Sequence, residues 1–329
     1  MDMKYDVSVI ILTYNPSLKS LITTLISILK QKECSFQIII SDDGSKANYF
    51  DIIEQIFKYY SFEDYILLPH NKNGGTVKNL FDSIGYCEAE YVKYIGQGDL
   101  LYNHLTLKKL LDIIKKKDME LVYGDAIPFS IANNKASILN IKLTPQRIKC
   151  YKEGNRKKIF KNYLICNDVA AGSTVFGRKE FITKYLSEGV GVIKLAEDLL
   201  IKLMICDNKK VGYVDAHVTF YETDSGISHS EKRFSVSAID NKSFYHLLFD
   251  RLPKDMDAGH IKKVLQKRLV FLEKTETKSK IDYLFSDIAI LMFHLERLIH
   301  GRKITDTNKS YLDCCYKETS QLLRKLKLK

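Results

Sequence analysis

The sequence predicts an α/β fold: a GT-A-like, Rossmann-type mixed and mostly parallel sheet flanked by helices, with a helical C-terminal extension. Residues 7–13 form a near-continuous apolar run, which is typical of a strand buried on both faces. A helix follows, because apolar residues recur at spacings of three and four, at Leu18, Leu21, Leu25 and Ile28. A second apolar run covers residues 36–41. A strand, a helix and a strand over about forty residues require a parallel pair.

The ends of these two strands carry the candidate binding residues. Asn15 and Pro16 predict the helix start, with Asn15 as the N-cap and Pro16 at the first helical position. In parallel sheets, ligands bind beyond the carboxyl ends of the strands. We therefore expect a ligand near Thr13, Tyr14, Asn15, Asp42 and Asp43.

The order and separation of two motifs carry a resemblance. The run Val-Ser-Val-Ile-Ile-x-Thr-Tyr-Asn at residues 7–15 is followed by Asp-Asp-Gly-Ser at residues 42–45. Together they resemble the opening of the family-2 inverting glycosyltransferases, which have the GT-A fold, and the resemblance covers residues 5–230. It implies a catalytic domain at 1–235, which leaves 236–329 as a helical region for packing, dimerisation or membrane-surface contact.

The resemblance implies a nucleotide-sugar donor, with UDP as the expected nucleotide. Thr13, Tyr14 and Asn15 would frame the base and ribose, and Asp43, beside Asp42, would hydrogen-bond the base. Lys78 lies in a segment that resembles the family's nucleotide-pocket segment, so it would neutralise the pyrophosphate as a point charge. The alternative for Lys78 is an ordinary solvent-exposed lysine on a helix.

The segment after the strand at residues 90–95 stands where the family has Asp-x-Asp-Asp, whose carboxylate holds a divalent metal on the diphosphate. Here Gly96 and Gly98 replace two acids and only Asp99 remains. We expect Mg²⁺ or Mn²⁺ at Asp99, with a weakened metal site, since a hard cation needs oxygen ligands. The alternatives are metal-independent transfer and Asp99 as a turn or capping residue.

Glu197 and Asp198 resemble the family's Glu-Asp motif at the start of a helix, which supplies the catalytic base. Adjacent carboxylates on a helix project about 100° apart, so only one faces the site. We assign Asp198 as the base and Glu197 as structural or acceptor-binding. The alternative is that both acids merely complement the helix dipole. Farther along, His229 lies five residues from the family's histidine position, which favours a plain loop histidine.

The resemblance implies single displacement with inversion at the anomeric carbon. The acceptor would be a lipid-linked or oligosaccharide glycan in surface polysaccharide synthesis, such as capsule or O-antigen. Nucleotidyl transfer is a weaker alternative, because residues 13–16 are not a glycine-rich phosphate loop. A non-catalytic binder of sugar nucleotides or nucleic acid is a further alternative, motivated by the two glycines and the basic charge.

Composition bounds the localisation. No apolar run approaches the ~18–20 residues of a membrane span, and the N-terminus lacks the pattern of a signal peptide. The seven cysteines form no Cys-x-x-Cys pair, so neither a disulfide framework nor a zinc site is indicated. We expect a cytoplasmic protein. The alternative is a cytoplasmic protein attached peripherally to the inner face of the cell membrane.

The net charge of +11 calls for an anionic partner, and anionic substrates or membrane are expected rather than nucleic acid. Residues 301–329 carry eight Lys/Arg against three Asp/Glu, an excess of five. Two amphipathic helices are predicted near residues 284–298 and 312–326. They either pack on the catalytic domain or a second subunit, or dock on an anionic membrane surface.

Overall fold

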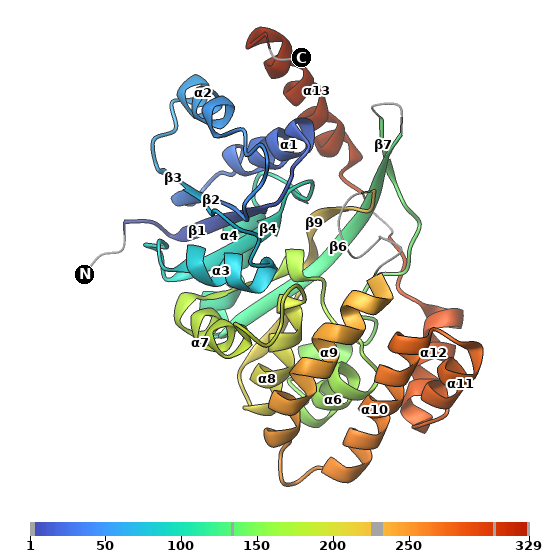
Figure 1. The fold of residues 1–329 in the computed structure, drawn as a ribbon. Helices are drawn as coiled ribbons and strands as arrows, with labels where there is room; N and C mark the ends of the chain where they lie inside the picture. The colour runs from blue at the N-terminus through green and yellow to red at the C-terminus, as the bar shows by residue number, and fades with distance from the viewer. Residues whose placement is uncertain (1–3, 133–134, 225–232, 305–306, 328–329) are drawn as a thin grey trace.

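The computed structural model describes residues 4–132, 135–224, 233–304 and 307–327. Within them, one mixed sheet of nine strands has the order β3-β2-β1-β4-β8-β6-β9-β5, with β7 paired to β6 (Figure 1). The strands are β1 (Val7–Thr13), β2 (Phe36–Asp42), β3 (Tyr65–Pro69), β4 (Tyr91–Gly96), β5 (Leu100–Leu101), β6 (Leu121–Ala132), β7 (Lys135–Ile138), β8 (Phe176–Arg178) and β9 (Val211–Glu222). The predicted α/β class with a mostly parallel sheet is confirmed.

Helices cover both faces of this sheet. They are α1 (Leu18–Leu29), α2 (Phe50–Tyr60), α3 (Thr76–Ile84), α4 (Thr106–Lys116), α5 (Lys149–Lys152), α6 (Arg156–Phe160), α7 (Lys179–Gly189), α8 (Leu200–Cys206), α9 (Arg233–Asp250), α10 (Ala258–Lys274), α11 (Thr277–Leu284), α12 (Ile288–His300) and α13 (Lys309–Lys325). Short turns are the π-helical η1 (Lys161–Ile165) and the 3₁₀ turns η2 (Gly172–Thr174) and η3 (Glu197–Leu199). None of the described helices is both long and apolar enough to cross a bilayer.

The first half of the sheet follows the sequence prediction closely. β1 lies between β2 and β4, parallel to both, and β2 continues parallel to β3. All seven residues of β1 are buried, as expected for a strand covered on both faces. The carboxyl ends of β1, β2 and β4 therefore meet at one edge, where the candidate donor residues lie.

The predicted start of α1 is wrong. The N-cap is Ser17, whose hydroxyl accepts a hydrogen bond from Ser20 N at 3.4 Å. Asn15 instead has a left-handed backbone, with φ of 44°. Its side-chain oxygen accepts from Lys46 N at 3.1 Å. Asn15 is thus part of the loop at the strand ends, because its amide bonds across to the neighbouring loop and leaves the capping position to Ser17.

The second half of the sheet is more extended than the sequence suggests. The apolar run at residues 121–123 alone indicates a short strand, but β6 continues to Ala132, parallel to β9. β9 is continuous and carries a bulge, since the β6–β9 register shifts on both sides of Asp125. A side chain at Gly124 would meet the carbonyl oxygen of Ala216, so the glycine permits the bulge.

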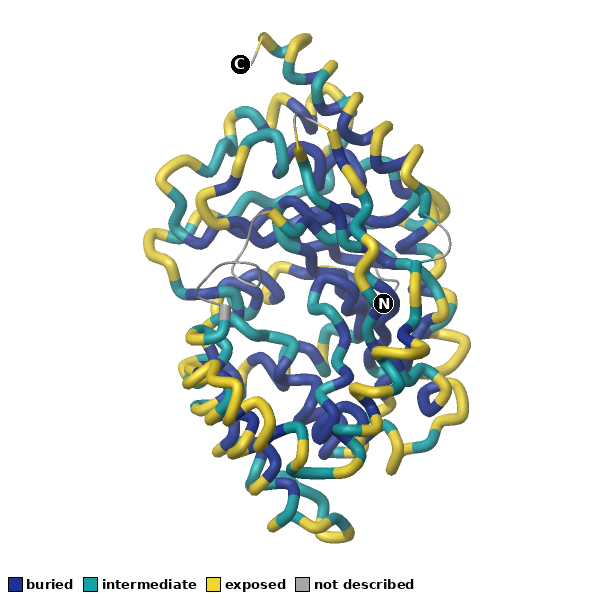
Figure 2. The backbone as a smooth tube through the Cα atoms, turned by 90° about the vertical axis from the view of Figure 1, so that its right-hand side faces the viewer, coloured by how far each residue is buried: buried dark blue, intermediate teal, exposed yellow. Residues whose placement is uncertain are grey.

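The C-terminal helices divide into two groups (Figure 1). Helices α9–α12 join the molecule through α9 on α8 and α10 on η1, whereas α13 lies on the opposite side of the sheet and packs on α1. There the hydroxyls of Thr23 and Thr319 are 2.9 Å apart and the Tyr60 hydroxyl donates to Glu318 at 2.6 Å. The two hydrophobic cores, which lie along the sheet in Figure 2, both include residues from beyond the predicted boundary at 235. The boundary itself stays a prediction.

Candidate functional site

Asp42 ties the end of β1 to the loop that follows β2. Its carboxylate accepts from the Thr13 hydroxyl at 2.9 Å, from Ser45 N at 2.8 Å and from the Ser45 hydroxyl at 2.5 Å. The side chain is buried, with the residue 1% exposed. The hydrogen bond between Asp42 and Thr13 therefore holds the ends of β1 and β2 together. A direct contact of either residue with the donor stays a prediction.

Asp43 clamps a second loop to the same edge. One carboxylate oxygen accepts from Gly74 N at 2.7 Å and the other from Gly75 N at 2.9 Å. Its own backbone N–H donates to Thr13 O at 2.8 Å. Gly75 has a φ of 90°, which only glycine adopts readily. The carboxylate thus holds the loop before α3 in place, next to where a base would lie.

Tyr14 and Asn15 present the open surface of this edge. The Tyr14 ring is 49% exposed. Its backbone N–H donates to Gln97 Oε1 at 2.9 Å, and its carbonyl accepts from Gln97 Nε2 at 3.3 Å. Gln97 therefore joins the end of β1 to the end of β4, a role that the sequence comparison with acidic motifs did not reveal. The only sequence signal was its position between two glycines.

Lys78 lies on the first turn of α3 and pairs with Asp82. Its ammonium donates to the two Asp82 oxygens at 2.9 and 2.6 Å, and the lysine side chain is 54% exposed. This is the geometry of an exposed i,i+4 pair, which stabilises a helix only weakly. The structure matches the alternative reading of a surface lysine, and a pyrophosphate contact would require Lys78 to leave Asp82.

Asp99 lies beside a carboxylate that the sequence analysis missed. Glu222, at the end of β9, donates its backbone N–H to Asp99 Oδ1 at 2.9 Å. Its Oε2 is 2.0 Å from the point where a Cβ on Gly98 would lie. A side chain at position 98 would thus occupy the space that the Glu222 carboxylate fills. Because 123 residues separate Asp99 and Glu222, no local motif joins them.

These two carboxylates fit a divalent metal in part. No group of three or more His, Cys, Asp or Glu side chains suited to a metal occurs in the part of the chain that the structure describes. Burial, chiefly, and the nearby Glu222 charge raise the pKa of Asp99 to about 8. A hard cation would offset that repulsion and would take its other ligands from phosphate oxygens and water. The residues present therefore suit Mg²⁺ or Mn²⁺ bound together with a diphosphate.

Lys93 lies beneath the site as a fully buried cation. Its ammonium donates to Tyr94 O at 2.6 Å and to Ser173 O at 2.5 Å. Burial lowers the pKa of Lys93 to about 7, while the charges of Asp99 and Glu197 raise it. Lys93 is therefore within electrostatic reach of both the candidate metal ligand and the acidic pair. A lysine inside an otherwise apolar strand was the available sequence signal.

Glu197 and Asp198 form the 3₁₀ turn η3 directly before α8, as expected for acids at a helix start. The preceding segment is held by Asp240 of α9. Its carboxylate accepts from the backbone N–H groups of Lys194, Leu195 and Ala196 at 3.0, 2.9 and 2.8 Å. Asp240 thus fixes the acidic pair from 44–46 residues away, a separation that sequence reasoning could not bridge.

The environment of Asp198 suits proton transfer. Burial raises its pKa, while the charges of Lys202 and Arg268 lower it. Burial and the Asp198 charge likewise raise the pKa of Glu197. Lys202, one helical turn beyond Asp198, is itself buried at 1% exposure. A carboxylate with a raised pKa accepts a proton more readily than an exposed one, which is the requirement for a general base near neutral pH.

The predicted donor residues lie at the ends of β1 and β2, and Lys93 of β4 contacts η2, against which Glu197 lies. The Lys78 side chain lies against Gly74, whose backbone N–H donates to Asp43, while the Lys78 ammonium pairs with Asp82. His229 lies outside the described residues.

Comparison with known proteins agrees with this geometry. The family model described as Glycosyl transferase family 2 matches residues 8–177, just over half of the 329 residues. An uncharacterized glycosyltransferase, the MG060 homolog of Mycoplasma pneumoniae, is 29% identical over 121 residues, which cover 36% of this chain. The match spans only 40% of the length of that curated relative.

Two solved structures share the fold. S. aureus TarS 1–349 in complex with UDP has a TM-score of 0.51 and 16% identity, with 89% of this chain and 82% of that chain covered. The mannosyltransferase PcManGT from Pyrobaculum calidifontis, in complex with GDP-Man and Mn²⁺, has a TM-score of 0.57 and 10% identity, with 98% and 86% covered. At these identities the likeness concerns the fold alone. Together with the family model, it leads to one conclusion: this chain belongs to glycosyl transferase family 2.

Proposed function

We propose that this protein transfers a sugar from a nucleotide-sugar, with UDP as the expected nucleotide, to a hydroxyl group of a glycan acceptor. The observation that carries the proposal is the short path between the candidate donor edge and the acidic pair. Buried Lys93, in the strand before Asp99, donates to Ser173 O at 2.5 Å, and Glu197 Oε1 lies 2.2 Å from the point where a Cβ on neighbouring Gly172 would lie. A glycosyltransferase needs both groups at one site, since the diphosphate leaves from one face of the anomeric carbon and the hydroxyl attacks the other.

The donor would lie across the ends of β1, β2 and β4. The exposed Tyr14 ring supports a stacking role against the base, and Asp43 beside it has acceptor capacity left for a base N–H. Solved relatives in complex with UDP and with GDP-Man support a nucleotide-sugar here. Asp42 acts in this proposal as the residue that positions the loop.

Asp99 and Glu222 are the residues that would hold the metal ion. When bound, the ion supplies positive charge to the leaving diphosphate. The relative crystallised with Mn²⁺ supports the same assignment. Metal-independent transfer is the alternative that the two glycines favour, and activity in EDTA distinguishes the two.

Asp198 would take the proton from the acceptor hydroxyl. The acceptor oxygen forms a bond to the anomeric carbon from one face, and the bond to the nucleoside diphosphate breaks on the other, so that the diphosphate leaves with the electron pair. Configuration inverts. Lys202 and Arg268 support this role, because their charges oppose the rise that burial causes in the pKa of Asp198.

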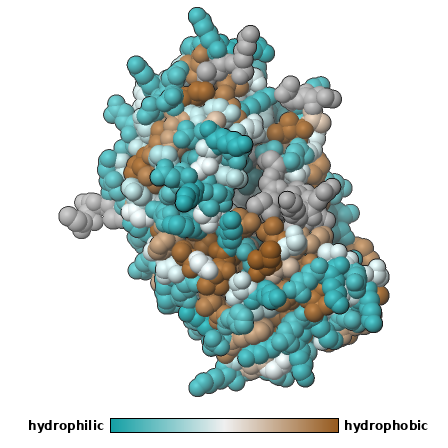
Figure 3. Space-filling view, viewed as in Figure 1, coloured by the Kyte–Doolittle hydropathy of each residue, from teal (hydrophilic) through white to brown (hydrophobic). Residues whose placement is uncertain are grey.

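The acceptor proposed from sequence is a lipid-linked glycan of surface polysaccharide synthesis, and an apolar stripe on α11 and α12 supports contact with its membrane. Residues spaced by four and three are between 43 and 69% exposed, namely Ile281, Phe285, Ile288, Met292, Leu295 and Ile299. Hydrophobic patches toward the right-hand edge of Figure 3, near these helices, interrupt a mostly hydrophilic surface.

An anionic bilayer is the occupant we propose for this stripe. The chain carries a net charge of +11, which attracts anionic lipid and repels a second copy of itself. α12 is also tied to the segment before α5, through Arg147 Nε to Glu296 Oε2 at 2.8 Å. The basic tail, in contrast, contributes little here, because α13 packs on α1.

Two experiments test these proposals. Incubation with a panel of UDP-, GDP- and dTDP-sugars should give nucleotide release with at least one donor, and failure to bind or turn over any donor would favour a non-catalytic protein. For the membrane, the full chain should co-sediment with anionic vesicles, and Ile288→Glu with Met292→Glu should abolish this while Val270→Glu on α10 does not. A dimer that the same double variant dissociates, without vesicle binding, would assign the stripe to a second copy.

A further inference from the structure

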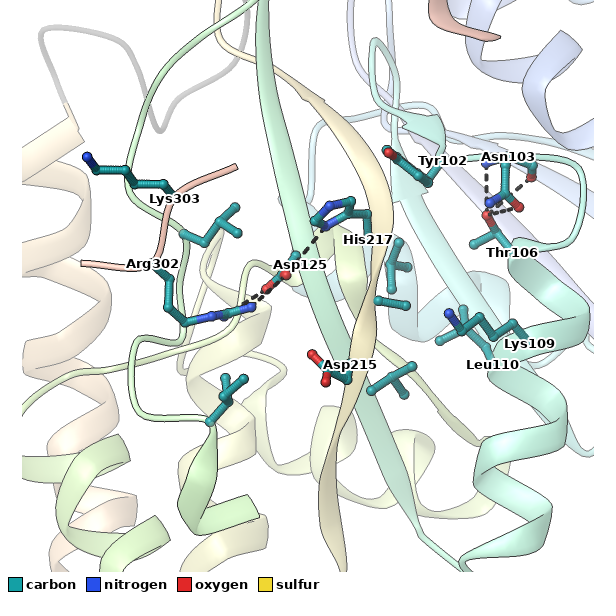
Figure 4. Close-up of a pocket in the computed structure, with 15 residues that line it drawn as sticks. Tyr102, Asn103, Thr106, Lys109, Leu110, Asp125, Asp215, His217, Arg302 and Lys303 are labelled. Carbon is teal, nitrogen blue, oxygen red and sulfur yellow. Dashed lines mark hydrogen bonds and ion pairs between the residues drawn. The ribbon is translucent and has the colours of Figure 1, made fainter. Parts of the chain in front are cut away.

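A cavity of about 490 Å³ lies away from the donor edge, across β9 between α4 and the connection from α12 to α13 (Figure 4). The volume is within the range of about 300–1,000 Å³ that is typical of small-molecule sites. None of the residues assigned to donor, metal or base lines it. The proposed glycosyl transfer therefore leaves this cavity without a role.

The bulge in β9 opens the cavity. All five consecutive residues from Val214 to Val218 line it. On a regular strand, successive side chains point to opposite faces, so this arrangement requires the register shifts that flank Asp125. The strand thus offers backbone groups as well as side chains to a ligand.

One wall is built around buried Asp125. Arg302 donates to its two oxygens at 3.0 and 2.8 Å, and Arg302 also donates to the Tyr213 hydroxyl at 2.7 Å. His217 Nδ1 lies 3.4 Å from Asp125 Oδ2, as the dashed lines in Figure 4 show. This network fixes the connection between α12 and α13 against the sheet, so the wall is rigid before any ligand binds.

The charge of the lining is positive. The lining includes three cationic residues, Lys109, Arg302 and Lys303, and two carboxylates, and the Lys303 ammonium points away from both carboxylates in Figure 4. Asp125 is already paired with Arg302, and Asp215 is paired with Lys152 at 2.6 Å. Lys109 and Lys303 have no ion pair among the described residues. The hydrogen bond from Lys152, with smaller contributions from the charges of Lys152, Arg302 and Lys109, lowers the pKa of Asp215.

The opposite wall combines polar and apolar side chains of the kind that hold a sugar ring. Asn103 and Thr106 lie at the start of α4, and Tyr102 packs its ring against His217 with centroids 5.0 Å apart. Leu110 adds apolar surface on this side, and Leu143, whose backbone N–H donates to Arg302 O, adds it on the other. A lone inorganic anion would fill only a small part of this space.

We propose that this cavity binds an anionic saccharide, a sugar ring that carries a phosphate or a carboxylate. The anionic group would pair with Lys109, and the ring would lie over the β9 bulge, beside the packed Tyr102–His217 pair. The ligand has two sources, a free sugar phosphate or an acidic sugar within a glycan chain. The inference extends the proposed glycosyl transfer without resting on it, because the binding is measured with no donor present.

Isothermal titration calorimetry on the full chain tests the proposal. Glucose 6-phosphate should bind saturably and more tightly than either inorganic phosphate or glucose, and UDP should not displace it. Lys109→Gln should weaken this binding about 5–10-fold, the effect of removing one charged hydrogen bond. Lys116→Gln, at an exposed position near the other end of α4, is the matched control and should bind as the wild type.

Two further arms complete the test. A tetrasaccharide that contains glucuronate distinguishes the sources: tighter binding than glucose 6-phosphate supports a glycan chain, and weaker binding supports a free sugar phosphate. The proposal is overturned if no ligand saturates at millimolar concentration or if Lys109→Gln binds as the wild type. Displacement by UDP would also overturn it, and so would inorganic phosphate binding as tightly as the sugar phosphate.

Discussion

Two pairs of adjacent acids, Asp42–Asp43 and Glu197–Asp198, have opposite surroundings. In the first pair, every carboxylate oxygen accepts a hydrogen bond from a backbone N–H or a hydroxyl group. Glu197 and Asp198 are half-buried, whereas Asp42 and Asp43 are buried. Desolvation nevertheless raises both pKa values of the second pair, and the Asp198 charge adds to the rise at Glu197. We expect carboxylates with satisfied hydrogen bonds to hold loops, and acids with raised pKa values to exchange protons. In our proposal this difference distinguishes scaffold from chemistry among residues that look alike in sequence.

We expect the largest effect at the pair Glu197–Asp198. Asp198→Asn should keep the fold and the nucleotide affinity but lower turnover by about 10²–10⁴-fold, because a general base is removed. Donor turnover and nucleotide binding measure the two quantities. Glu197→Gln is the paired control, and near wild-type turnover in Asp198→Asn would sink the assignment.

The carboxylates proposed to hold the metal, Asp99 and Glu222, should show a smaller, ion-dependent effect. Asp99→Asn and Glu222→Gln should each weaken nucleotide binding on the order of 10–100-fold in the presence of Mn²⁺, because the loss acts through the ion. Titration of UDP with Mn²⁺ and again in EDTA measures it. Equal weakening in both conditions would make the two acids structural.

The scaffold pair should affect stability. In Asp43→Asn, an amide N–H₂ replaces an oxygen that accepts from Gly75 N, so one backbone N–H loses its partner. We expect the free energy of unfolding to fall by about 1–3 kcal/mol. Urea denaturation measures it, with exposed Asp51→Asn on α2 as the control. An unchanged urea midpoint in Asp43→Asn would contradict a scaffold role for the Asp42–Asp43 pair.

The smallest effect concerns pH. The Lys202 charge lowers the pKa of Asp198. In Lys202→Gln that effect is lost, so the pKa of Asp198 rises and the base is protonated up to a higher pH. The acid limb of the turnover–pH profile should therefore move to higher pH. Movement to lower pH, or no movement, would exclude Lys202 as a positioning residue.

Sequence motifs predicted the half of the site that is local in the chain. Thr13, Tyr14 and Asn15 follow one strand and Asp43 follows the next, so strand pairing alone brings them together. Glu222 and Asp240 were not predictable in this way, because each acts on a segment far away in sequence. Their contacts arise only when β9 pairs with β5 and when α9 packs on the turn before α8.

The two amphipathic C-terminal helices illustrate the same limit. Both have an apolar face in sequence, yet α13 buries its face against α1, whereas α12 leaves Ile288 and Leu298 about 70% exposed. Periodicity predicts that a helix has an apolar side. It carries no information about which surface covers that side, since the covering residues, such as Thr23 beneath Thr319, are remote in the chain.

The anomeric configuration of the sugar released from the donor tests the central proposal most directly. Proton NMR can follow hydrolysis of an α-linked donor, such as UDP-glucose or whichever donor of the panel is turned over, before the free sugar equilibrates. The proposed attack from the face opposite the diphosphate, with Asp198 as base, predicts that the β-anomer appears first and that Asp198→Asn releases neither anomer at the wild-type rate. First appearance of the α-anomer, or no turnover of any donor in the panel, would contradict it.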